Sequence, residues 1–195
     1  MENEIKEAVP KYSFVTPAQY LEMERAAGFR SEYFDGYVQV MGGASLKHNI
    51  IASNIAAKVG HFLEGKNCRM LQSEMRIGSP SSDSYMYPDA LIVCGKPDLE
   101  DDKFDTLKNP AVIFEIISPS TAVYDKGRKF FFYQQIPSLK EYIMIDSMQR
   151  LIQLGRKQTD ESWRFEQIAD PNGLLKITTI EFNLSLSEIY FDAEF

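Results

Sequence analysis

The segment AVIFEIISPS, residues 111–120, predicts a central strand of a sheet with one charged residue in its middle. Its apolar residues are typical of a strand that is covered on both faces. Glu115 interrupts this run, and an isolated buried carboxylate costs several kcal/mol unless something compensates it. Glu115 is therefore a candidate functional residue. The alternative is a structural ion pair with Lys129 or Arg128.

The patterns on either side of this strand predict an α/β fold with a mixed central sheet. Helices are expected over residues 16–28, 45–64 and 120–136, with a short one from Ser185 or Ser187. Strands are expected at 68–77, 84–94, 111–118 and 140–146, with a hairpin at Asp35-Gly36 and an antiparallel pair in RLIQLGR and SWRFEQIA. We expect a flexible N-terminus over 1–13, a loop at 95–110, and one domain over 14–195.

The composition limits the classes of function. The net charge of −7 argues against a protein that holds nucleic acid by bulk electrostatics. It does not exclude an enzyme that uses a local basic strip and a metal ion. We find no signal peptide and no apolar run near the ~20 residues that span a bilayer, so a cytoplasmic protein with no membrane contact is expected. Cys68 and Cys94 are expected to be reduced core residues.

A second carboxylate lies in YPDALIV, where Asp89 follows Pro88 at the start of an apolar run. If this strand neighbours the one that carries Glu115, the two carboxylates converge at one end of the sheet. Such carboxylates repel each other unless a proton or a cation lies between them. Mg²⁺ or Mn²⁺ would neutralise this repulsion, because both ions bind carboxylate oxygens as ligands. The alternative for Asp89 is a turn residue after proline.

The helix after this strand carries the densest basic cluster of the chain. Asp125, Lys129 and Tyr133 are spaced i, i+4, i+8 and share one helical face. A lysine beside a metal site orients water or stabilises charge on a phosphate. The alternatives are a solvated face for Lys129 and a simple i, i+4 partner role for Asp125. His48 lies near the apolar stripe of its helix, which favours a half-buried histidine over a substrate contact.

Several motifs, in this order along the chain, resemble those of a known protein family: YFDGYVQVMGG, His48, YPDALIV, FEIISPST, DKGRK with a following tyrosine, and EYIMID. Over residues 14–190 the chain resembles the Uma-type family of candidate endonucleases, which belongs to the PD-(D/E)xK nuclease superfamily. The resemblance implies a restriction-endonuclease-like core with flanking helices, preceded by a helix and a hairpin. It also implies that Asp89 and Glu115 hold the divalent metal.

The resemblance assigns further roles. The lysine that the superfamily has two residues after the acid is Ile117 here, and the family pattern implies that Lys129 replaces it. Glu32 matches an acidic position of the family and is a supporting ligand or an orienting group. The Ile116 carbonyl is expected to help hold the metal.

We therefore expect a metal-dependent endonuclease that hydrolyses phosphodiester bonds, with DNA as the substrate. Asp89, Glu115 and Lys129 are its catalytic candidates. A homodimer is implied, because cutting both strands needs two sites. The alternative is a non-catalytic nucleic-acid-binding or regulatory module of the same fold, which the charge of −7 and Ile117 favour. A third hypothesis is a hydrolase of smaller phosphate esters.

Overall fold

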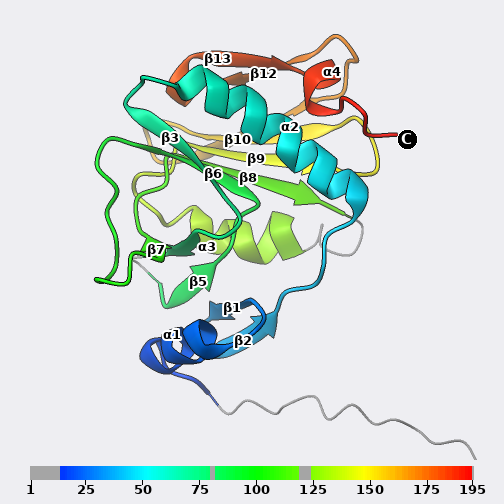
Figure 1. Cartoon of the computed structure of the whole chain (residues 1–195). Coiled ribbons are helices and arrows are strands. Elements are labelled where there is room, and N and C mark those ends of the chain that lie inside the picture. The colour runs from blue at the N-terminus through cyan, green and yellow to red at the C-terminus, as the bar shows by residue number, and fades with distance from the viewer. Residues whose placement is uncertain (1–13, 80–81, 119–123, 195) are drawn as a thin grey trace, which may run out of the picture.

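The segment with Glu115 forms an inner strand of a six-stranded sheet, in the order β11-β10-β9-β8-β6-β3 (Figure 1). The computed structural model describes residues 14–79, 82–118 and 124–194. The strands are β3 (Cys68–Gln72), β6 (Ala90–Cys94), β8 (Val112–Ile117), β9 (Glu141–Asp146), β10 (Ile152–Lys157) and β11 (Trp163–Ile168). Strand β8 is buried at every residue and pairs parallel with β9 and antiparallel with β6. The expected mixed central sheet is confirmed.

Two layers cover this sheet. On one face lie α2 (Leu46–Leu63), the ribbon β12 (Leu174–Ile177) and β13 (Phe182–Ser185), the 3₁₀ turn Thr178–Ile180 and α4 (Leu186–Ile189). On the other face lie a π-helical turn (Tyr124–Lys129) and α3 (Phe130–Tyr133). Figure 1 shows α2 and α3 on opposite sides of the strands. The apolar residues of α2 that pack on the sheet recur at helical spacing: Ile51, Ile55, Val59 and Leu63.

A second sheet has five strands in the order β2-β1-β5-β4-β7. They are β1 (Ser31–Phe34), β2 (Tyr37–Val40), β4 (Arg76–Gly78), β5 (Ser84–Met86) and β7 (Thr106–Leu107), and α1 (Pro17–Ala26) packs on them. The Tyr20 ring stacks on Tyr33 and Tyr85 in this small core. Because β1 carries Glu32 on this sheet, the second sheet contributes directly to the candidate site described below.

The sequence patterns predict the first third of the fold well. Thr16 caps α1 in a capping box with Gln19. Asp35 and Gly36 both adopt positive φ in the hairpin turn, as a two-residue turn of this kind requires. Helix α2 fills the expected range 45–64 almost completely.

Other expectations are corrected. The expected strands 68–77 and 84–94 each divide into two strands that belong to different sheets. The first divides at a turn in which Met75 N donates to Gln72 O, and the second divides at Pro88, which has no N–H for a sheet ladder. The expected helix 120–136 is a π-helical turn and one α-helical turn, and its first residues lie outside the described residues. The ribbon β12–β13 was not expected. The N-terminus 1–13 also lies outside the described residues.

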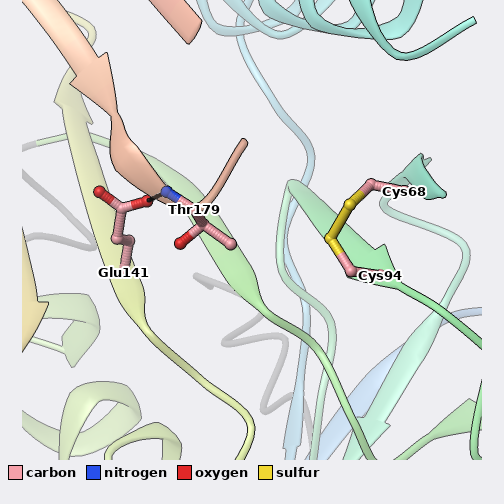
Figure 2. The surroundings of a disulfide bond; sticks show 4 residues. All are labelled: Cys68, Cys94, Glu141 and Thr179. Atoms are coloured by element: carbon pink, nitrogen blue, oxygen red, sulfur yellow. Dashed lines mark hydrogen bonds between the residues drawn. A yellow bond between two sulfur atoms is a disulfide. The ribbon is translucent and has the colours of Figure 1, made fainter. Parts of the chain in front are cut away.

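The expectation of reduced cysteines is wrong: Cys68 and Cys94 form a disulfide between β3 and β6 (Figure 2). The two residues are 26 positions apart in sequence, but they are direct partners in the strand register, with Cα atoms 4.0 Å apart. Spacing along the chain does not reveal such a pair. Figure 2 also shows buried Glu141 accepting a hydrogen bond from Thr179 N, which ties β9 to the 3₁₀ turn.

Candidate active site

Glu115 lies in the middle of β8, and its side chain points to the face that α3 covers. Ile113 and Ile117, two residues away on either side, belong to the apolar cluster of that face. Glu115 is 3 % exposed. Its Oε1 accepts hydrogen bonds from Lys129 Nζ at 3.0 Å and from Tyr133 OH at 3.1 Å. The expected burial is confirmed, and the carboxylate is compensated by a lysine and a phenol.

Lys129 ends the π-helical turn and is 4 % exposed, so it does not lie on a solvated helix face. Its ammonium group lies 3.0 Å from both Glu115 Oε1 and Glu32 Oε1, 3.2 Å from Tyr87 O and 3.9 Å from Asp125 Oδ1. Burial works to lower the pKa of Lys129, but Glu115 and Glu32 outweigh it and raise that pKa well above its usual value. Lys129 is therefore held as a cation. π-Helical turns are rare in proteins, and those that occur are often found at functional sites.

Glu32 reaches the site from the hairpin of the second sheet and is 3 % exposed. Its Oε1 accepts from Tyr87 N at 3.0 Å as well as from Lys129, and its Oε2 accepts from Tyr124 OH at 2.8 Å. Among the described residues, the hydrogen bonds of this carboxylate thus hold Lys129, Tyr87 N and the Tyr124 hydroxyl in place.

Asp89 lies just before β6, where Pro88 ends the preceding extended segment. Its Oδ2 accepts from Ile116 N at 2.7 Å, and its Oδ1 lies 3.0 Å from His48 Nε2. The side chains of His48 and Asp89 are 19 % and 20 % exposed, so this pair forms the open edge of the site. Burial works to lower the pKa of His48, but Asp89 and the Ile116 backbone outweigh it and raise that pKa.

These groups carry more negative charge than the lysine neutralises. Three carboxylates, those of Glu32, Glu115 and Asp125, surround the Lys129 ammonium group. A fourth, that of Asp89, is close enough to Glu115 to act on it electrostatically. Burial raises the pKa of Glu115 well above its usual value, and Asp125, Asp89 and Glu32 add to this effect while Lys129 opposes it. A buried cluster that attracts a proton in this way also attracts a further cation.

The donor chemistry fits a hard divalent cation, because carboxylates and a backbone carbonyl are its preferred ligands. In the three described ranges, no three His, Cys, Asp or Glu side chains form a ready-made metal cluster. Both hydrogen bonds that described residues make to Glu115 end on Oε1. Binding an ion therefore requires Asp89 to exchange an internal partner and Glu115 to turn its second oxygen toward the ion.

All six candidates from the sequence meet in this site: Glu32, His48, Asp89, Glu115, Asp125 and Lys129. Tyr124 and Tyr87 were not expected to take part. The only sequence signal for Tyr124 is its place next to Asp125, and Tyr87 acts through its backbone, which side-chain patterns do not reveal. The ion pair of Glu115 with Lys129, first considered as an alternative to a functional site, is a component of it.

A sheet that brings an aspartate before one strand to an acid inside the next, with a buried lysine beside them, is characteristic of restriction-endonuclease-like folds. Residues 17–187 match the model of the Uma2 family, described as "Putative restriction endonuclease". The chain therefore belongs to the Uma2 family, and the resemblance noted from its motifs is confirmed.

Individual relatives agree with this assignment. The chain is 30 % identical over 164 residues to the uncharacterized protein sll1609 of Synechocystis sp., covering 84 % of this chain and 93 % of the relative. It is 32 % identical over 149 residues to slr1290 of the same organism, covering 76 % and 77 %. A crystal structure described as a "putative nuclease belonging to DUF820" from Anabaena variabilis superposes with a TM-score of 0.76 at 17 % identity, covering 90 % of this chain and 97 % of that one. This likeness confirms the fold.

In the part of the chain that the structure describes, no helix is both long and apolar enough to cross a membrane.

Proposed function

We propose that this protein is a metal-dependent endonuclease that hydrolyses phosphodiester bonds of DNA. The observation that carries the proposal is a buried Lys129 ammonium 3.0 Å from Glu115, in a cluster where carboxylates outnumber the cation. Strongly perturbed ionisable groups of this kind cluster at functional sites. Mg²⁺ or Mn²⁺ is the proposed ion, and Asp89 and Glu115 are its proposed ligands, with help from the Ile116 carbonyl.

Each residue has a role that follows from its contacts. When bound, the divalent ion supplies Lewis acidity at a phosphoryl oxygen. Lys129 presents a fixed positive charge that stabilises developing phosphate charge or orients the attacking water. Glu32 and Asp125 hold the Lys129 ammonium in place. Tyr133 fixes Glu115 through its Oε1, which leaves Oε2 to turn toward the ion.

The position of Lys129 accounts for the missing lysine of the superfamily pattern, which is expected two residues after Glu115. Ile117 occupies the place of the usual lysine, and its side chain packs in the apolar cluster beside α3. Lys129 approaches the same acid from the helix that follows β8, within hydrogen-bonding distance. The buried contact supports a lysine relocated to the helix over a site that has lost its lysine.

The rival is a non-catalytic nucleic-acid-binding or regulatory module of the same fold, and the net charge of −7 favours it. An enzyme tolerates this charge more easily than a binding module does, because a bound ion neutralises part of the local charge and turnover does not require tight binding. A homodimer is part of the proposal, because cutting both strands requires two sites.

The proposal is tested by incubating supercoiled plasmid DNA with the protein and Mg²⁺ or Mn²⁺, and separating the products by gel. We expect nicked and linear products from the wild type, and rates at least ~100-fold lower for Glu115→Gln and Lys129→Met. Lys140→Met is the matched control, because Lys140 is exposed and lies next to Glu141, at the opposite end of the sheet from Asp89.

Three other outcomes decide among the alternatives. Salt-sensitive DNA binding without cleavage would favour the non-catalytic module. Hydrolysis of bis(p-nitrophenyl) phosphate without cleavage of any DNA would favour a hydrolase of smaller esters. Cleavage that persists in Glu115→Gln at the wild-type rate would refute the assigned site.

A further inference from the structure

His48 is placed at the open edge of the site by the first turn of α2. Ser45 caps this helix, and its Oγ accepts a hydrogen bond from His48 N at 3.2 Å. The imidazole Nε2 lies 3.0 Å from Asp89 Oδ1, and Asp89 Oδ2 accepts a hydrogen bond from Ile116 N at 2.7 Å. The imidazole, the Asp89 carboxylate and the Ile116 backbone thus meet at one point, beside Glu115 on the same strand.

The two proposed metal ligands each have an internal positively charged or proton-donating partner. Glu115 is bound by Lys129, and Asp89 by His48. An ammonium group has no lone pair and remains only a donor, whereas a neutral imidazole nitrogen is an acceptor and a common metal ligand. Of these two partners, therefore, only His48 is able to change from a partner of the carboxylate into a ligand beside it.

The present spacing suits such a change. Ligands on neighbouring corners of an octahedron with bonds of about 2.1 Å lie about 3.0 Å apart. His48 Nε2 and Asp89 Oδ1 are already at 3.0 Å. An ion that replaces the shared proton keeps His48 Nε2 and Asp89 Oδ1 near their present spacing, while Glu115 turns its second oxygen toward the ion. The alternative is that the hydrogen bond between His48 and Asp89 only holds the Asp89 side chain in place.

We propose that His48 Nε2 is a third side-chain ligand of the divalent ion held by Asp89 and Glu115. This inference rests on the proposed function and deepens it. A nitrogen ligand shifts the preference of the site toward Mn²⁺, because Mg²⁺ selects oxygen ligands whereas imidazole suits transition metals. The site then combines α2, the segment before β6, and β8.

The test is pulsed electron paramagnetic resonance of Mn²⁺ bound to the untagged full chain. The echo modulation of Mn²⁺ reports an imidazole nitrogen in its coordination sphere. The chain has two histidines, so His61→Gln is the matched control: His61 is exposed and lies near the far end of the same helix. We expect the nitrogen signal in the wild type and in His61→Gln, and its loss in His48→Gln.

Affinities measured by calorimetry complete the test. We expect Mn²⁺ affinity to fall about tenfold in His48→Gln, equivalent to about 1.4 kcal/mol, with a smaller fall for Mg²⁺. A wild type that binds Mn²⁺ without any nitrogen signal overturns the inference and leaves the proposed function intact. Tighter Mn²⁺ binding by His48→Gln also overturns it, because His48 then blocks the site. If the wild type binds no Mn²⁺ at all, the inference and the proposed metal site fail together.

Discussion

Lys129 Nζ and Glu32 Oε1 lie 3.0 Å apart, although Glu32 belongs to the hairpin of the second sheet and Lys129 to the helical segment that covers the central sheet. This buried ion pair joins the two sheets at the candidate active site. Both side chains are at most 5 % exposed, so water does not screen the pair. Loss of Lys129 leaves the Glu32 carboxylate without its counter-ion in the interior, whereas Lys129 without Glu32 still has Glu115 at 3.0 Å.

Removing the ammonium group therefore affects stability as well as activity. We expect Lys129→Met to lower the free energy of unfolding by about 3–5 kcal/mol, because Glu32 and Glu115 are left buried without their counter-ion. Urea denaturation without metal measures the change. Lys126→Met is the control, since Lys126 is exposed on the same turn. Equal stability of the two variants would mean that Lys129 does not neutralise the cluster.

The raised pKa of Glu115 makes stability depend on pH in a defined direction. A carboxylate whose folded pKa exceeds its usual value of 4.5 favours folding while protonated, and this contribution is lost as the pH rises through the folded pKa. In EDTA we expect Glu115→Gln to gain about 1–2 kcal/mol over the wild type at pH 8, and less as the pH falls toward 4.5. Thermal unfolding across this range measures the difference.

The control for this profile is Glu74→Gln, because the Glu74 side chain is 82 % exposed. We expect its stability to differ from the wild type by the same small amount at every pH. A Glu115→Gln variant that becomes less stable than the wild type as the pH rises would show that the buried carboxylate is favourable in its charged form.

The disulfide predicts a response to reductant. Cross-linking two cysteines 26 positions apart stabilises by about 3 kcal/mol. We expect the unreduced, denatured protein to show no free thiol, and reduction to lower the free energy of unfolding by that amount. The double variant Cys68→Ser/Cys94→Ser is the control, and reductant should not change its free energy of unfolding. Two titratable thiols in the freshly purified, unreduced protein would contradict the bond.

Reduction should leave metal binding unchanged. Asp89 precedes the first residue of β6 and Cys94 is its last residue, so the disulfide and the candidate site lie at opposite ends of the strand. Calorimetry with Mn²⁺ before and after reduction checks this point. A change in affinity would reveal that the pairing of β3 with β6 positions Asp89.

The fold and the candidate site differ in how far sequence predicts them. Local patterns suffice for α1, the hairpin and α2, because caps, turn residues and helical periodicity lie within a few residues of each other. The sequence predicts Glu115 as a candidate functional residue because its charge interrupts an apolar strand. The proposed roles of Asp89 and Lys129 rest on the order of the motifs along the chain.

What sequence did not reveal depends on contacts between distant elements. The pairing of Cys68 with Cys94 is a matter of strand register. The contact of His48 with Asp89 depends on how α2 crosses the end of β6, and no periodicity encodes that crossing. The strands that divide at residues 73–75 and at Pro88 are predicted as continuous because strand-like residues lie on both sides of each break, although the two parts belong to different sheets.

The central claim is that Asp89 and Glu115 hold a divalent ion, and titration of Mn²⁺ into the wild type and into Glu115→Gln by calorimetry tests it most directly. This measurement needs no knowledge of the substrate. We predict saturable binding by the wild type and at least a tenfold loss in Glu115→Gln, about 1.4 kcal/mol, while Glu74→Gln binds as the wild type does. Equal binding by Glu115→Gln and the wild type, or no binding by either, would contradict the account.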